Sequence, residues 1–444
     1  MRAIRLHYRP VRYILARGVS RRAPTWSLGP LGFIRLDDVE PPALPGPDWV
    51  RVETTLSGIC GSDLAAITAH DSFTLEPFGE YPFTFGHENV GRIVEQGDAA
   101  GGGGGDDDWS IGDRVVVNPM LSCAQRGFDP PCDACARGEY GLCRRTTDSP
   151  MAGPMVGYCP DTGGGWSPSF VAHRSRLHRP GELPDEVAVL ADPFASALRP
   201  VLLHPPRGAG RSAEADERAA PEARPILAAA PARGERGADR DGDVVLVIGA
   251  GTIGLLTVRA LRLTGWTGPV AVQARYAHQR RLAEQAGADR VLMSRDAVFE
   301  WAASLPGARS HKPSLAPRFV DGGPSLVYDT VGSQGTVRQS LALAREGGRV
   351  VLVGGAARVD ADWTRVWYRQ LTVAGVFAYG LVPFEGERRD IYDVTLELMR
   401  RDDDFAGLGM LTHVYRLEDY RAAISAALDK DGHGSVKVAF RPGD

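Results

Sequence analysis

Four of the six cysteines of this chain lie close together in sequence. They are Cys123, Cys132, Cys135 and Cys143, in the spacing C-x8-C-x2-C-x7-C. Four neighbouring thiolates suit a closed tetrahedral zinc site, which stabilises a fold and takes no part in a reaction. Two disulfides are an alternative in an oxidising compartment, and an iron–sulfur cluster is another. We expect a structural zinc in this cysteine lobe, at about 118–145.

A second set of metal ligands is indicated around Cys60, which lies in the sequence Gly-Ile-Cys-Gly-Ser-Asp, and His87, which lies in Gly-His-Glu. One thiolate and one imidazole make half of an open zinc site, which needs a third protein ligand. Alone, a cysteine and a single histidine are more often core residues. Asp63 makes the metal-ligand interpretation the stronger one, because its carboxylate could accept the other ring N–H of His87. Cys159 has no such neighbours and is expected to be a small buried side chain.

A glycine-rich sequence, Gly-Ala-Gly-Thr-Ile-Gly, has the form G-x-G-x-x-G and stands between an apolar run at 244–248 and a helix-like segment at 255–263. Gly249 permits a tight turn, Gly251 lets the backbone approach a pyrophosphate, and Gly254 lets the helix pack close to the sheet. The N-terminus of such a helix offers N–H groups to phosphates. The motif alone would be only a Gly-rich turn, but in this setting it predicts dinucleotide binding.

The residue that selects between the two nicotinamide dinucleotides is usually an acid about 20 residues further on, which binds the ribose 2′-OH. Here that position is Ala274, and Arg275 follows it. No carboxylate would repel a 2′-phosphate, and a guanidinium is placed to pair with one. The sequence therefore favours NADP over NAD, unless Arg275 merely solvates the end of a strand.

The elements that must position these residues fall into two groups. Buried strands are predicted at 244–248, 270–274, 325–328 and 349–353, with helix-like segments between them. This alternation predicts a doubly wound α/β domain. Before it, short strands, Gly and Pro turns and the cysteine lobe indicate a mainly β domain. An amphipathic helix at 417–428 and a strand at 436–440 are expected near the end of the chain.

Two segments differ from the rest by composition. The segment 98–110 holds five consecutive glycines followed by three aspartates and is expected to be a flexible surface loop. The segment 205–242 is rich in Ala, Arg, Glu, Gly and Pro, with Ile226 and Leu227 as its only large apolar side chains. It cannot bury enough surface to offset the entropy of ordering, and we expect a flexible insertion.

The whole-chain composition excludes several classes of protein. The 444 residues are 43% hydrophobic and 24% charged, with a formal charge of −4, so no strongly basic balance points to nucleic acid. No apolar run approaches the roughly 18 residues that span a bilayer. No apolar signal-peptide core is present at the start. We expect a cytoplasmic protein with no membrane partner.

With these motifs in this order, the chain resembles the zinc-dependent medium-chain alcohol dehydrogenase family of alcohol, sorbitol and threonine dehydrogenases. The motifs are Gly-Ile-Cys-Gly-Ser-Asp at 58–63, Gly-His-Glu at 86–88, Gly-Asp-Arg-Val at 112–115, the cysteine lobe and Gly-Ala-Gly-Thr-Ile-Gly at 249–254. The resemblance implies an α/β protein with a GroES-like, mainly β catalytic domain and a doubly wound Rossmann cofactor domain. The expected catalytic domain is 1–204 and 376–444, the flexible insertion 205–242, and the NAD(P)-binding domain 243–375.

The resemblance also implies roles for single residues. Cys60, His87 and Asp192 would ligate a catalytic zinc, and Glu88 would sit near the metal and exchange with its water. Ser62 would accept the proton of the alcohol, next to Asp63. Backbone groups of Thr252 and Ile253 would bind the pyrophosphate.

Three departures from the family pattern have consequences. Eight residues instead of the usual two separate the first two lobe cysteines, so Cys123 is the least expected of the four ligands. Ala65 stands where many relatives carry a histidine that passes the proton to water, so this relay must end differently. The acid at the 2′-OH position is missing, as Ala274 shows.

The sequence thus predicts a zinc-dependent oxidoreductase that transfers a hydride between an alcohol, aldehyde or ketone and NAD(P), with one catalytic and one structural Zn2+. Alternatives are a polyol or amino-alcohol dehydrogenase that uses NAD, and a cofactor-binding protein without turnover. A homodimer or homotetramer is expected.

Overall fold

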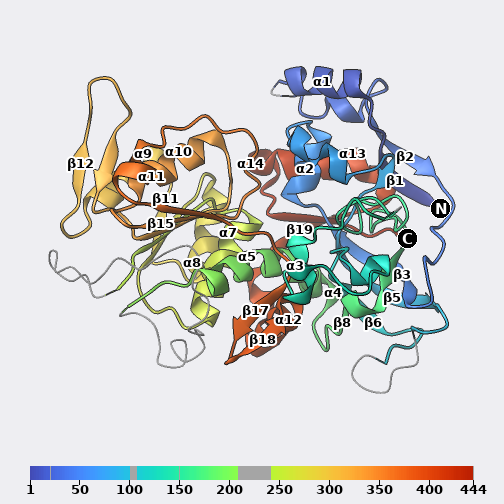
Figure 1. Cartoon of the computed structure of the whole chain (residues 1–444). Coiled ribbons are helices and arrows are strands. Elements are labelled where there is room, and N and C mark those ends of the chain that lie inside the picture. The colour runs from blue at the N-terminus through green and yellow to red at the C-terminus, as the bar shows by residue number, and fades with distance from the viewer. Residues whose placement is uncertain (21, 101–107, 150, 209–241, 444) are drawn as a thin grey trace. The chain divides into compact units, whose positions relative to one another are not determined.

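The computed structural model describes residues 1–20, 22–100, 108–149, 151–208 and 242–443. The chain forms two compact units, one from Met1–Pro193 together with Thr395–Asp444, the other from Phe194–Val394 (Figure 1). This division differs from the predicted boundaries, because helix α5 (Ala191–Leu203) and the residues up to 394 make their contacts in the second unit. There Tyr328 Oη donates to the carbonyl of His204 at 2.7 Å, and Arg199 donates to that of Phe377 at 2.7 Å.

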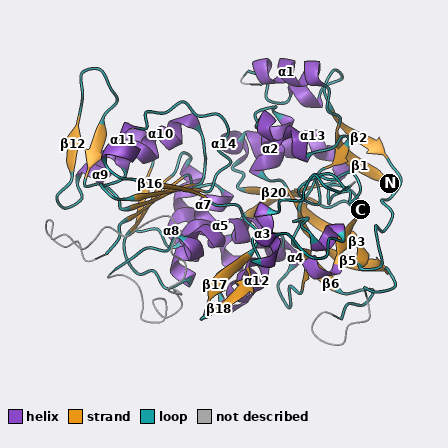
Figure 2. Cartoon of the chain, viewed as in Figure 1, coloured by secondary structure: helices purple, strands orange, loops and turns teal. Residues whose placement is uncertain are grey.

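The first unit is built mainly from β-strands, as the sequence predicts (Figure 2). Its larger sheet has the order β19-β20-β3-β5-β6-β8, with β7 also paired to β3, and its smaller sheet has the order β2-β1-β4. The strands are β1 (Arg2–Leu6), β2 (Ile34–Asp38), β3 (Trp49–Gly58), β4 (Phe83–Thr84), β5 (Glu88–Gln96), β6 (Arg114–Val117), β7 (Ser169–His173), β8 (Leu177–His178), β19 (Leu411–Tyr415) and β20 (Lys437–Phe440). Strands β19 and β20 bring the C-terminal part of the chain into this sheet.

Short helices connect and cover these strands. They are α1 (Pro10–Val19), α2 (Gly61–Ile67), α3 (Asp133–Ala136), α4 (Asp185–Ala188), α13 (Tyr420–Leu428) and α14 (Lys430–His433). The 3-10 turn η7 (Leu417–Asp419) and α13 together cover the helix predicted at 417–428. The helix α13 packs through Ile424 into a core that also holds Phe85, Trp166 and Phe440.

A second core of this unit lies between β3, β5, β6 and β7. It includes Val52, Phe170 and Cys159, which is fully buried, so the expectation for Cys159 is confirmed. Trp109 belongs to the same core and is only 3% exposed. The predicted surface loop at 98–110 is therefore wrong at this end, because the indole anchors the chain there. The glycine run at 101–107 lies outside the described residues.

The second unit contains a six-stranded sheet whose described pairs are all parallel, in the order β11-β10-β9-β14-β15-β16. Its strands are β9 (Val245–Ile248), β10 (Val270–Gln273), β11 (Arg290–Leu292), β14 (Leu326–Asp329), β15 (Arg349–Leu352) and β16 (Thr372–Gly375). Its other helices are α7 (Thr252–Leu263), α8 (Ala277–Ala286), α9 (Arg295–Ala303), α10 (Gln334–Leu343) and α11 (Thr364–Tyr368), and α12 (Ile391–Arg401) begins in this unit and continues into the first. The four predicted buried strands are confirmed as β9, β10, β14 and β15, and the order is that of a doubly wound fold.

Two small hairpins complete the second unit. They are β12 (Arg309–His311) with β13 (Phe319–Asp321), and β17 (Leu381–Phe384) with β18 (Glu387–Asp390). Neither was predicted, because their strands are short and partly exposed. Among the described residues, no helix has both the length and the apolar character needed to cross a bilayer.

The described chain closes on itself around the segment 209–241, which lies outside the described residues and holds most of the predicted insertion. The backbone N–H of Asp243 donates to the carbonyl of Arg207 at 2.8 Å, and the N–H of Arg207 donates to Asp243 Oδ2 at 2.8 Å. A Cβ on Gly208 would lie only 2.6 Å from the Cα of Gly242. The chain therefore leaves and re-enters the fold at one point.

Candidate active site

Cys60 is placed by the end of β3 and the start of α2. It is the N-terminal capping residue of α2, and its backbone N–H donates to Asp63 Oδ2 at 2.9 Å. Asp63 is fully buried in the first turn of that helix, where a carboxylate also interacts favourably with the helix dipole. The spacing of Cys60 and Asp63 in the motif thus serves to start this helix with the thiol at its tip.

The carboxylate of Asp63 also faces His87 and Tyr158. Its Oδ1 lies 3.4 Å from His87 Nδ1, as the sequence led us to expect of this pair. The same Oδ1 accepts a hydrogen bond from the hydroxyl of Tyr158 at 2.9 Å, and no motif predicted this partner. Because Nδ1 of His87 faces Asp63, Nε2 is the ring atom left for a metal.

The surroundings of His87 favour a positive charge on its ring. Burial of the ring acts to lower the pKa of His87, but the neighbouring charges of Asp63 and Cys60 raise that pKa well above its usual value. A divalent cation would supply the same kind of charge to this anionic group.

Glu88 lies beside His87 and forms a buried ion pair with Lys437 of β20. Lys437 Nζ also donates to the carbonyl of Ile59 at 3.1 Å. Burial raises the pKa of Glu88, the charges of Lys437 and His87 act against this, and the charge of Asp192 raises it again. Gly58 makes room for the pair, because a Cβ there would lie 1.9 Å from Glu88 Oε2 and 2.8 Å from Lys437 Cε.

The metal-ligating atoms of Cys60, His87 and Glu88 lie within 4.8 Å of one another. Among the described side chains this group does not include Asp192, which was the expected third ligand. Asp192 is only 4% exposed at the start of α5 and acts electrostatically on Glu88. A thiolate, an imidazole and a carboxylate are a donor set that zinc accepts, so the residues fit this metal with either carboxylate as third ligand.

The residues around this centre differ in their access to solvent. Ser62 is exposed in the first turn of α2, and Ala65 one turn later has no group that could carry a proton. His70 is exposed, with its Nδ1 3.4 Å from the Ser20 hydroxyl. In this structure His70 is therefore a surface side chain that contacts Ser20.

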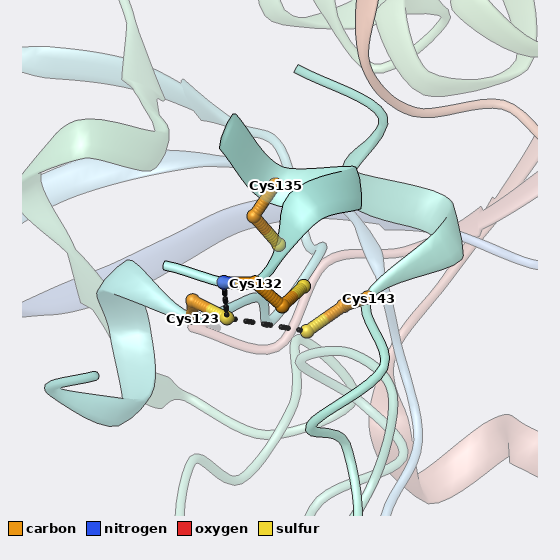
Figure 3. A group of neighbouring side chains, drawn as sticks. All are labelled: Cys123, Cys132, Cys135 and Cys143. Carbon is orange, nitrogen blue, oxygen red and sulfur yellow. Dashed lines mark hydrogen bonds between the residues drawn. The ribbon is translucent and has the colours of Figure 1, made fainter. Parts of the chain in front are cut away.

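The four lobe cysteines come together, as Figure 3 shows. Their sulfur atoms lie within 4.8 Å of one another, and Cys123 Sγ is 3.7 Å from Cys143 Sγ. Cys123 Sγ also accepts the backbone N–H of Cys132 at 3.3 Å. The eight intervening residues form the turn η3 (Ala124–Arg126) and a left-handed residue, Gly127, which return the chain to Cys132. The unusual spacing therefore does not remove Cys123 from the group.

The thiols of the lobe differ in acidity, because burial raises the pKa of Cys123 and of Cys135, whereas the pKa of Cys132 is lowered. Burial alone would raise the pKa of Cys132, but hydrogen bonds from the backbone N–H groups of Arg144 and Cys135 lower it to about 6. Arg126 lies beside the lobe, where burial lowers the pKa of its guanidinium and the nearby thiolate charges raise it. Four sulfur ligands with this arrangement fit a closed zinc site.

The glycines of the predicted dinucleotide motif form the turn between β9 and α7. Gly249 has φ +102°, a left-handed conformation that favours glycine. A Cβ on Gly254 would lie 1.9 Å from the carbonyl oxygen of Gly249, so only glycine allows this approach. Gly251 caps α7, and Thr252 and Ile253 are its first two residues, whose N–H groups point out of the helix end. This end of the helix is suited to a phosphate.

Arg275 follows β10 and is exposed, whereas Ala274 is buried. The backbone N–H of Arg275 donates to Gln279 Oε1 at 3.0 Å, and the guanidinium carbon of Arg275 lies 5.4 Å from the centre of the Tyr276 ring. Within the described part of the chain, the contact of its guanidinium is with the aromatic ring of Tyr276.

Comparisons with known proteins agree with this geometry. The model for the alcohol dehydrogenase GroES-like domain matches residues 46–185, and that for the zinc-binding dehydrogenase matches residues 252–400. L-Threonine 3-dehydrogenase of Paraburkholderia xenovorans (strain LB400) is 25% identical over 399 residues, 89% of this chain and 92% of the relative. (R,R)-Butanediol dehydrogenase of Bacillus subtilis (strain 168) is 27% identical over 422 residues, 92% of this chain and 96% of the relative.

A solved structure is similar over nearly the whole chain. It is that of a protein described as a zinc-binding dehydrogenase from Sinorhizobium meliloti 1021, bound to NADP. The two chains are 26% identical with a TM-score of 0.62, and the match covers 92% of this chain and 96% of the other.

Proposed function

This chain belongs to the zinc-dependent medium-chain alcohol dehydrogenases, and from that premise we propose that it interconverts an alcohol and its carbonyl compound with NADP as preferred cofactor and two zinc ions per chain. Oxidoreduction at a CH–OH group with zinc and a nicotinamide cofactor is the activity of its family. The cofactor preference, the number of zinc ions and the residue roles are the finer part of the proposal.

The observation that carries the proposal is the meeting of Cys60, just after β3, with His87 and the buried carboxylate of Glu88 at the start of β5. We assign Cys60, His87 and Asp192 as ligands of the catalytic zinc. Glu88 is the alternative third ligand, but its ion pair with Lys437 engages its charge and favours Asp192. Cys123, Cys132, Cys135 and Cys143 are assigned to the structural zinc.

When bound, zinc supplies Lewis acidity toward the substrate oxygen and the nicotinamide supplies the hydride acceptor. Asp63 holds the His87 ring and the start of α2 in place. The hydroxyl of Ser62 takes up the proton of the alcohol and must pass its own onward, because a neutral hydroxyl is a weak base. Since Ala65 cannot take this proton, water at the exposed Ser62 is assigned that role.

The preference for NADP rests on Arg275, whose exposed guanidinium can pair with a 2′-phosphate where other sequences carry an acid. The similar structure from Sinorhizobium meliloti was obtained with NADP bound, which supports this choice. Backbone N–H groups of Thr252 and Ile253 are assigned to the pyrophosphate.

A second candidate function is favoured by the relatives. Two of the matched curated proteins are an L-threonine 3-dehydrogenase and an (R,R)-butanediol dehydrogenase, which are named for an amino-alcohol and a diol substrate. Oxidation of a polyol or amino alcohol with NAD is therefore the alternative. A screen of alcohols, polyols, amino alcohols and aldehydes with each cofactor separates the two.

Metal analysis tests the zinc assignment. Freshly purified protein should contain two zinc ions per chain, and Cys60→Ala should lose one of them together with activity. Cys135→Ala should instead lower the unfolding temperature, because a structural zinc contributes folding free energy directly. A single zinc in the wild-type protein, or full zinc content in Cys60→Ala, would contradict the assignment.

The proposal includes a homodimer or homotetramer. Strand β16 is an end strand of its sheet, and the preceding helix α11 exposes Trp367 to 80%. An open strand edge beside an exposed indole is a surface that a second copy would cover. Light scattering should give a multiple of the monomer mass, and Trp367→Glu should reduce it.

A further inference from the structure

Tyr158 lies outside every motif of the sequence, in the segment between the cysteine lobe and β7. Two glycines bring this segment against the residues that precede His87. A Cβ on Gly157 would lie 2.5 Å from the carbonyl oxygen of Gly86, and the N–H of Gly165 donates to that same carbonyl oxygen at 2.9 Å. This close approach of two backbones puts the next side chain, Tyr158, beside the metal-ligating histidine.

The ring of Tyr158 is half-buried among aromatic side chains. Its centroid lies 5.6 Å from that of His87, 5.0 Å from that of Phe83 and 6.2 Å from that of Phe85. These contacts restrict the orientation of the ring and place it next to the imidazole. The position of the hydroxyl follows from this packing.

The hydroxyl of Tyr158 contacts the carboxylate beside the proposed ligand His87. It donates to Asp63 Oδ1 at 2.9 Å. Burial raises the pKa of Tyr158 well above its usual value, the charge of Asp63 raises it further, and a hydrogen bond with Ser62 acts against both. The phenol oxygen therefore contacts Asp63, the carboxylate that faces His87.

The bond to Asp63 determines how that carboxylate is turned. Oδ2 accepts the N–H of Cys60 at 2.9 Å, while Oδ1 accepts Tyr158 and lies 3.4 Å from His87 Nδ1. The shorter contact of Oδ1 is the one to the tyrosine. Without that donor, Oδ1 would be left with the longer contact to His87, and the carboxylate could rotate about its bond to Cβ.

We propose that Tyr158 is a positioning residue of the active site, whose hydroxyl fixes Asp63 and, through it, His87. The proposal rests on the proposed function, because it gives Tyr158 its task through the ligand His87. Partners of metal-ligating histidines typically change metal affinity or activity by about 10- to 100-fold when they are removed.

The test is Tyr158→Phe, which keeps the ring and removes the hydroxyl, in the full-length holoenzyme. We expect release of one zinc to a chelator to become about tenfold faster, and kcat to fall about tenfold or more with little change in KM. In protein with Co2+ at the catalytic site, the ligand-field absorption should shift, because the imidazole is held differently. Tyr328→Phe is the matched control, since it removes another buried hydroxyl, which donates to the carbonyl of His204 at 2.7 Å within the second unit.

A double-mutant comparison separates positioning from a loss of folding. Asp63→Asn alone should shift the Co2+ spectrum in the same way, and adding Tyr158→Phe should change it little further, because both act on one ring. Native zinc release, kcat and Co2+ spectrum in Tyr158→Phe would overturn the proposal. Additive effects of the two substitutions would overturn it as well. If instead wild-type protein holds no zinc that depends on Cys60, the proposed function itself fails.

Discussion

The buried pair of Glu88 and Lys437 shows how closely single residues are fitted around the proposed zinc. Both side chains are at most 3% exposed, and they meet over Gly58, the last residue of β3. The register places Gly58 opposite Glu88 on one side and opposite Ala439 on the other. A residue with any side chain at this crossing would have to displace the ion pair.

Gly58→Ala should therefore disturb the zinc centre as well as the fold. The added Cβ would overlap Glu88 Oε2, and overpacking of this kind typically costs about 1–3 kcal/mol. We expect a lower midpoint of urea unfolding and less than one zinc per chain at the catalytic site. Gly61→Ala is the control, because a Cβ there meets no atom within 4 Å. Native zinc content and stability in Gly58→Ala would show that the pair can move aside.

Arg275 determines the expected cofactor preference. Arg275→Ala should weaken NADP(H) binding at least tenfold, which corresponds to about 1.4 kcal/mol, and should leave NAD(H) binding nearly unchanged. Fluorescence titration of the reduced cofactors measures both. Arg280→Ala, which removes another exposed guanidinium five residues along the chain, should have little effect on either. A wild-type protein that already prefers NAD(H) would disprove the role of Arg275, while the reading of the glycine turn would survive.

At this scale the sequence predicts the residues that stand in motifs and misses those that do not. Cys60, Asp63 and His87 were expected to meet, and the structure places them together. Lys437 and Tyr158 were missed, because each reaches the site from a distant segment with no motif of its own. A lysine within the otherwise apolar run 436–440 was the one available signal for Lys437. The third ligand stays a prediction, since Asp192 and Glu88 are both buried acids.

Among the elements, α1 and the segment after α2 are joined by a half-buried acid, Asp71. The hydroxyl of Tyr13 in α1 donates to Asp71 Oδ1, and Arg17 donates to the carbonyl of Asp71 at 3.3 Å. Burial raises the pKa of Asp71 to about 6. The charged form is therefore disfavoured in the folded protein, and the contact of α1 with this segment depends on pH.

Asp71→Asn should remove that pH dependence. The pKa of the Asp71 carboxyl is about 3.9 in the unfolded chain and about 6 in the folded protein. Its protonation therefore contributes fully to the stability of the folded state below about pH 4, and this contribution is lost as the pH rises through about 6. The shift of about two units corresponds to at most about 3 kcal/mol at pH 7. The unfolding temperature of the wild type should therefore fall more between pH 4.5 and 7 than that of Asp71→Asn. The exposed Asp38→Asn is the control, and equal slopes for wild type and Asp71→Asn would contradict the assignment.

Elements with a strong period were predictable, whereas short and partly exposed ones were not. The strands β9, β10, β14 and β15 are fully or nearly fully apolar and buried, so their hydrophobic runs identified them. The hairpin of β17 and β18 contains Pro383 and four consecutive charged residues in its second strand. No alternation of apolar and polar residues marks it, and contacts with the rest of the second unit determine its place.

For the molecule as a whole, the segment 209–241 should be dispensable. Arg207 and Asp243 are hydrogen-bonded to each other on both sides of it, so joining Gly208 directly to Gly242 requires little change in the described backbone. We expect the shortened protein to keep kcat/KM and unfolding temperature close to those of the wild type. A deletion that also removes Arg207 and Asp243 should be destabilising, because Asp243 accepts from Arg349 at 2.8 Å as well. Loss of activity in the shorter deletion would assign the segment to an interface or a lid.

Because Arg207 and Asp243 are hydrogen-bonded to each other, the number of residues encoded between them can change without changing the backbone on either side. Coding sequence gained or lost between these two residues need not alter the register of β9 or the position of α5, so recombination here would seldom be selected against. The same property offers an attachment point within the chain. A reporter or ligand-binding domain whose own termini lie close together could be inserted between Gly208 and Gly242, as domains with neighbouring termini commonly tolerate. The inserted domain would then be linked to the second unit by two short connections, and both ends of the chain would remain as they are.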